Sequence, residues 1–182
     1  MEDARIGFYR SCVSDSRFMG AVLVTNSYGV PVEFKFTEPI VPSKTQRMVY
    51  GRVLERFLRE DVIRNRLFGE VTQGPSLFVL APEEFESYQG SGPPEVVALR
   101  REDGTRLKAA GLLSRIDERE ILLQLAAGED AARLSFGKMD RRLQEKVVHF
   151  MLHLSRSMDL LEPMERLDRA LQNLVGESFH LP

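Results

Sequence analysis

Residues 20–58 decide how the first half of this chain folds, and they read GAVLVTNSYGVPVEFKFTEPIVPSKTQRMVYGRVLERFL. Residues 20–25 are apolar and partly β-branched, which is the composition of a buried strand. Turn-forming residues follow at 26–29. Val32, Phe34 and Phe36 then alternate with polar residues, so their side chains share one face of a strand. The stretch therefore predicts a β-hairpin.

A long helix is expected after this hairpin, from residue 43 to residue 68. Ser43 is a suitable N-cap, and Gly69 is a suitable stop. At 100° per residue, four arginines of this helix fall on one stripe: Arg52, Arg56, Arg59 and Arg66. Such a stripe could follow the phosphates of a nucleic acid. The alternative is a face that meets only solvent or a partner, because the apolar residues of the same helix require a polar side.

Outward from this stretch, the remaining chain predicts an α+β fold. Residues 76–80 read as a strand, and the segment after residue 82 reads as a short helix. Short strands at 96–100, 112–116 and 121–125 predict an antiparallel meander, with exposed charges in the turn between Arg115 and Arg119. Periodic leucines and methionines then predict a C-terminal helical pair.

Two halves are expected within these 182 residues. The first is an α+β half at 1–88, and the second, at 95–182, holds the meander and the C-terminal helices. Between them, residues 89–94 are rich in glycine and proline and predict a linker or a loop. The halves could also form one domain.

Composition restricts the class of protein. Hydrophobic residues make up 43% and charged residues 29%, as in an ordinary globular protein. The formal net charge of −2 gives no overall basic field, and the single cysteine, Cys12, rules out a disulfide framework. No signal-peptide pattern and no apolar run of about 20 residues are found, so we expect a cytoplasmic protein without membrane contact.

The sequence offers no complete catalytic motif. No phosphate-binding loop and no nucleophile elbow are present, although residues 11–16 collect hydroxyls, a thiol and a carboxylate. We therefore predict no catalytic residues and no cofactor. One weak metal site remains, because Glu145, His149 and His153 lie at i, i+4 and i+8 on one helix side and histidines four apart can hold zinc. Surface histidines are the alternative.

Three functional hypotheses result. Met151, Met158 and Met164 join leucines in the C-terminal helices, and methionine suits adaptable contact surfaces. This predicts a non-enzymatic protein-interaction or assembly subunit of a cytoplasmic complex, which binds a protein partner or itself through these helices. An intramolecular core is the other interpretation of the same methionines. The second hypothesis is nucleic-acid binding by the arginine stripe, and the third is a metal-dependent enzyme that uses the histidine face.

Overall fold

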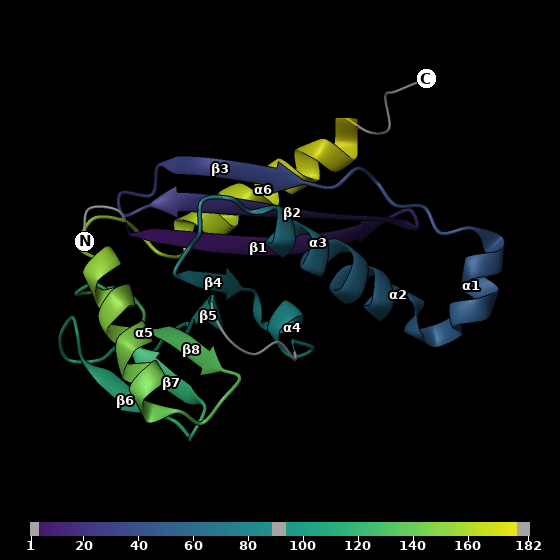
Figure 1. Cartoon of the computed structure of the whole chain (residues 1–182). Coiled ribbons are helices and arrows are strands. Elements are labelled where there is room, and N and C mark those ends of the chain that lie inside the picture. Colours follow the sequence, from purple (N-terminus) through teal and green to yellow (C-terminus); the bar gives the residue numbers. More distant parts are fainter. Residues whose placement is uncertain (1–3, 89–93, 178–182) are drawn as a thin grey trace.

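A single eight-stranded sheet forms the centre of the molecule (Figure 1). The computed structural model describes residues 4–88 and 94–177. The strand order is β3-β2-β1-β4-β5-β8-β7-β6; β1, β4 and β5 run parallel, and the other neighbours are antiparallel. The strands are β1 (Arg5–Ser14), β2 (Arg17–Asn26), β3 (Pro31–Phe36), β4 (Leu77–Leu80), β5 (Glu95–Arg101), β6 (Leu113–Arg115), β7 (Glu120–Leu123) and β8 (Ala132–Phe136).

Helical segments cover both faces of this sheet. They are α1 (Lys44–Tyr50), η1 (Gly51–Val53), α2 (Leu54–Arg56), η2 (Phe57–Arg64), α3 (Asn65–Glu70), α4 (Pro82–Phe85), α5 (Arg141–Leu154) and α6 (Glu162–Glu177). One core lies between the sheet and the α5 and α6 helices, and a second lies between the sheet and the segments from α2 to α3. Successive side chains of a strand point to opposite faces, so the buried strands β1 and β2 supply residues to both cores.

A glycine allows the second core to close tightly. Gly20 lies in β2 under η2, and a Cβ atom built there would lie 2.3 Å from Cγ2 of Ile63. Ile63 is fully buried against this strand. The glycine that opens the apolar run therefore serves helix packing, because the missing side chain is the space that Ile63 fills.

The predicted α+β class is confirmed. The predicted hairpin corresponds to β2 and β3, and the predicted C-terminal helices correspond to α5 and α6. The three strands of the predicted meander correspond to β5, β6 and β7, but only β6 and β7 pair with each other. Because β5 pairs with β4 and β8, the observed meander is β6-β7-β8. Two strands were not predicted. β1 is an interior strand between β2 and β4, although it contains arginine, glycine and serine, and β8 lies in the part of the chain after residue 125 where we expected only helices. The single helix expected at 43–68 is instead divided by a 3₁₀ turn, η1, and an eight-residue π-helix, η2.

The sheet runs through both predicted halves, because β4 pairs with β5 on either side of the expected linker. Of that linker, 89–94, only Pro94 lies within the described residues. The division into two halves stays a prediction. In the described part of the chain, no helix has the length and the apolar character needed to cross a membrane.

Candidate functional site

A buried carboxylate marks the end of the parallel strand β4. In open α/β sheets, ligand sites lie beyond the carboxyl ends of the parallel strands. There the chain turns from β4 into α4, which brings Glu84 against β1 with only 3% of its surface exposed. Its Oε1 atom accepts hydrogen bonds from the backbone N–H of Ser11 (3.0 Å), the Ser11 hydroxyl (2.5 Å) and Nη2 of Arg59 (2.9 Å). This carboxylate is fully engaged within the protein.

The π-helix explains how two arginines reach the same glutamate. In η2, hydrogen bonds join residues five apart, so Arg59 and Arg64 come onto one side. Arg64 donates from Nη1 to the backbone carbonyl of Glu84 at 3.3 Å. The Tyr9 hydroxyl donates to the backbone carbonyl of Arg59 at 3.2 Å. Burial, with a further contribution from the charge of Glu84, raises the pKa of Tyr9 far above its usual value, so Tyr9 stays a neutral donor.

A second set of ion pairs ties the same region to α6. Arg10 of β1 donates to the carboxylate of Glu83 and, from Nε at 2.5 Å, to Oδ1 of Asp168. Burial alone would lower the pKa of Arg10, but its bonds to these two carboxylates raise it above the usual value. The acids at this end of the sheet are thus neutralised by arginines. Within residues 4–88 and 94–177, no group of three or more histidine, cysteine, aspartate or glutamate side chains could hold a metal ion.

The weak metal prediction gains no support from the placement of its residues. Glu145, His149 and His153 all lie on α5, with Glu145 and His149 exposed and His153 partly exposed. They belong to no potential metal-holding group among the residues described. The site stays a prediction from the sequence.

The four stripe arginines do not share one free face. Arg59 is held by Glu84, Arg66 is paired with Glu70 at 2.9 Å, and Arg56 is paired with Glu60 at 3.2 Å. Arg52 is exposed and has no ion pair with a described residue. The 100° spacing on which the stripe depended fails because the 3₁₀ and π segments change the rotation per residue.

A different group of cations lies free beside Arg52. We call residues 44–53 the basic arm; it contains Lys44, Arg47 and Arg52 and no acidic residue. None of these three cations forms an ion pair with any residue that the structure describes. Helix α1 buries no side chain, and Met48 and Val49 are each 75% exposed. In Figure 1, α1 lies beyond the sheet at the far right.

The basic arm is ordered in spite of its exposure. Ser43 and Gln46 form a capping box at the start of α1. At its other end, the Tyr50 ring stacks on Phe57 with a centroid distance of 4.7 Å. Of the three cations in this segment, only Arg52 belonged to the predicted arginine stripe. A count of charges in short windows would have found Lys44 and Arg47, since no acid interrupts residues 44–53.

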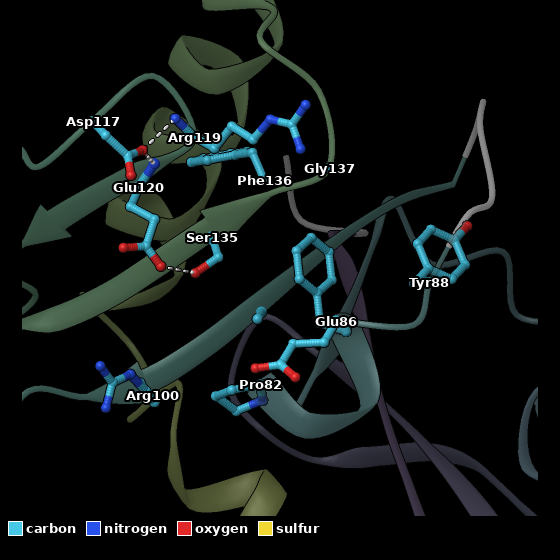
Figure 2. A pocket seen from close by; sticks show the side chains of 12 residues that line it. Pro82, Glu86, Tyr88, Arg100, Asp117, Arg119, Glu120, Ser135, Phe136 and Gly137 are labelled. Atoms are coloured by element: carbon cyan, nitrogen blue, oxygen red, sulfur yellow. Dashed lines mark hydrogen bonds between the residues drawn. The ribbon is translucent and has the colours of Figure 1, made fainter. Parts of the chain in front are cut away.

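An open cleft of about 640 Å³ lies between α4 and the strands β5 and β8 (Figure 2). Its walls include Phe85, Glu86 and Tyr88 on one side and Arg119 and Phe136 on the other. Volumes of this order are typical of small-molecule sites. Arg119 was predicted to lie in a turn, and the cleft was not predicted, because its walls come from segments that meet only in the folded sheet.

The C-terminal methionines belong to the protein's own core. Met151 is fully buried in the core between the sheet and α5 and α6, and Met158 and Met164 are partly buried against the same core. The intramolecular interpretation of these residues therefore accounts for them. Their apolar side chains cover the sheet and are not collected on an outer surface.

Known proteins resemble this chain in structure only. No protein family model matches the sequence, and no curated protein matches it. Human ENDOV shares 13% identity at a TM-score of 0.55 over 96% of this chain and 85% of its own. Endonuclease V of Ciona intestinalis, solved with a 24mer DNA that contains an inosine followed by a ribo-adenosine, shares 12% identity at a TM-score of 0.55, over 96% of this chain and 87% of its own.

Argonaute of Marinitoga piezophila, in complex with a 5′ OH guide RNA and target DNA, has the same fold over a smaller share of its length. It shares 8% identity at a TM-score of 0.51, over 93% of this chain and 30% of its own. At these identities the likeness establishes the fold. The prediction of a non-enzymatic protein-interaction or assembly subunit was wrong: the fold is shared with endonuclease V and Argonaute, and the methionines that motivated the prediction lie in the core.

Proposed function

We propose that this chain binds a nucleic-acid strand and that the basic arm contacts its phosphates. The observation that carries the proposal is the shared fold, which covers nearly all of this chain and most of an endonuclease V that was solved with DNA. The cytoplasmic location predicted from the sequence is part of the same proposal.

The charge distribution on the helical side supports the arm as the contact surface. Arg56, Arg59 and Arg66 are each neutralised by a nearby glutamate, whereas Lys44, Arg47 and Arg52 are exposed and form no ion pair with a described residue. Free cations in water release counterions from a phosphate backbone when they bind it, and this release favours association. The exposed apolar side chains between them offer contacts to bases and sugars.

The proposal covers binding and not cleavage. The carboxylates beyond β4, Glu83 and Glu84, are each held by an arginine, and within the described residues no acidic cluster is placed to hold a metal ion. The supporting geometry is therefore that of a binding protein on a nuclease-type fold.

Fluorescence anisotropy with labelled single-stranded DNA, single-stranded RNA and duplex DNA tests the proposal. The triple variant Lys44→Ala, Arg47→Ala, Arg52→Ala removes the free cations. When three contacts to a single strand are lost, the slope of log K against log salt should become shallower by about 2. The loss of affinity between 50 and 200 mM salt should then be roughly 20-fold smaller than for the unmodified protein. The matched control is Arg142→Ala, Lys146→Ala, Arg156→Ala, which removes three exposed cations of the same types from α5 and the turn after it.

Two results would overturn the proposal. One is the absence of binding to all three nucleic acids at low salt. The other is an equal loss of salt slope in the arm variant and in the control variant, because this would show that binding follows net charge and not the arm.

A further inference from the structure

The cleft in Figure 2 contains two charged side chains that the protein itself does not use. Three other charges in its walls are committed. The carboxylate of Asp117 accepts hydrogen bonds from the backbone N–H groups of Arg119 (2.7 Å) and Glu120 (2.8 Å). The carboxylate of Glu120 binds Arg133 at 2.9 Å. The guanidinium of Arg100 forms an ion pair with Glu102 at 3.1 Å. The guanidinium of Arg119 and the carboxylate of Glu86 have no hydrogen bond or ion pair with any other described residue.

These two groups stand on opposite walls. Glu86 follows α4, and Figure 2 shows its carboxylate directed into the cleft, whereas Arg119 extends from the wall formed by β7 and β8. Beside Glu86, the partly buried rings of Phe85 and Tyr88 form apolar surface on the same wall, with a centroid distance of 6.5 Å. The ring of Phe136 packs into the core that includes α5. Tyr88 is fixed from behind, because the guanidinium of Arg64 lies 5.1 Å from its ring centroid.

The chemistry of a fitting ligand follows from these groups. It is planar, so that it can lie against the aromatic wall of Phe85 and Tyr88. It carries an anion for Arg119, and it offers hydrogen-bond donors to Glu86. A nucleotide meets all three requirements. Among the bases, only guanine places two donors side by side on its Watson–Crick edge, where they match the two oxygens of a carboxylate. Adenine and cytosine place an acceptor beside their amino group, and hypoxanthine lacks the second donor.

We propose that the cleft between α4 and β8 binds a guanine nucleotide, with the base edge on Glu86 and the phosphate on Arg119. The guanine can belong to a free nucleotide or to an unstacked position of a bound strand. In the strand form the inference rests on the proposed function, whereas the free nucleotide does not require the basic arm.

Isothermal titration calorimetry of the full chain with GMP and IMP is the first test, because the two ligands differ only in the amino group that Glu86 would bind. A hydrogen bond to a charged group is strong enough that GMP should bind at least about tenfold more tightly than IMP. Glu86→Gln should abolish this preference, and Arg119→Ala should weaken both ligands. Glu165→Gln, at an exposed glutamate on α6, is the matched control and should leave the preference intact.

The source of the guanine is decided with thymine 9-mers that carry one central guanosine or one inosine. If the 9-mers show a preference for guanosine over inosine that Glu86→Gln abolishes, and GMP and IMP show no such preference, the ligand is a base within a strand. Equal binding of guanine and inosine in both formats, no binding of either, or a preference that survives Glu86→Gln would overturn the inference. The arm triple variant keeps the two proposals separate, since it should weaken the 9-mers and leave GMP binding unchanged.

Discussion

Replacement of Arg59 by methionine isolates the energetic role of the buried glutamate beyond β4. The guanidinium of Arg59 reaches Oε1 of Glu84 at 2.9 Å and Oγ of Ser11 at 2.9 Å. Arg59→Met removes these two contacts, together with the partly exposed ion pair to Glu55 at 3.3 Å, and keeps most of the apolar side-chain volume. Glu84 then stays buried with Ser11 as its remaining side-chain partner.

The expected cost follows from the burial of the two partners. Breaking a buried ion pair by removing one member costs about 3–5 kcal/mol, because the other charge is left without compensation. The side chain of Arg59 is 27% exposed, so water screens part of the interaction. We therefore expect Arg59→Met to lower the free energy of unfolding by about 2–4 kcal/mol. For a protein of this size the melting temperature should fall by roughly 4–16 °C.

Urea unfolding followed by circular dichroism measures this cost, and a double-mutant cycle with Glu84→Gln assigns it to the pair. The control is Arg66→Met, which breaks the exposed pair with Glu70 and should change the free energy of unfolding far less, because water screens this pair. If Arg59→Met costs no more than Arg66→Met, or if the cycle gives no coupling, Arg59 does not serve Glu84 in the way described. Arg59→Met should also retain the salt slope of strand binding.

Three further predictions concern the fold. Burial alone would raise the pKa of Glu33, but hydrogen bonds, first from the backbone N–H of Gln73, lower it. The ionised carboxylate of Glu33 stabilises the fold at pH values above the pKa of about 4.3 that it has in the unfolded chain. This stabilisation is lost as the pH falls through the lower pKa of the folded protein. Glu33→Gln should therefore lower the free energy of unfolding at neutral pH, and this difference should shrink as the pH falls below the unfolded value of about 4.3; a difference that stays constant into this acidic range contradicts the account. Gly20→Ala should cost about 1–3 kcal/mol in urea unfolding, because the new methyl group overlaps Ile63; an unchanged midpoint would argue against the tight contact. Met151→Ala should lower the free energy of unfolding by about 2–5 kcal/mol, because it leaves a cavity in the core. The sedimentation coefficient should not change; an altered oligomeric state would instead show that Met151 lies in an interface.

Local patterns predicted β3 and α5. The alternation at Val32, Phe34 and Phe36 marks β3, although all three side chains are exposed and no residue of this strand is buried. The periodic apolar residues of α5 mark a helix with one buried face. β1 carries no such pattern, because an interior strand is covered on both faces of the sheet, and its small residues leave space for neighbouring side chains. Gly7, for example, leaves room for the ring of Phe78.

The basic arm could be predicted from the sequence only in part. Its lack of acids can be counted in the sequence, but the sequence does not tell that Lys44, Arg47 and Arg52 stay free while Arg56 is neutralised by Glu60. Whether a cation is free depends on which carboxylates the fold brings within reach. The stripe prediction treated all arginines of the segment alike and therefore combined free and paired side chains.

By itself, the sequence determined the α+β class, the hairpin and the two C-terminal helices, since each depends on residues close along the chain. Tertiary structure alone decided the π-helix, the Arg59–Glu84 pair and the cleft that holds Glu86 and Arg119. The π-helix meets Tyr9 from β1, and Arg59 meets Glu84 across 25 positions of sequence. Contacts of this kind are selected by the packing of the whole sheet, because the burial that makes them strong does not exist until the sheet has formed.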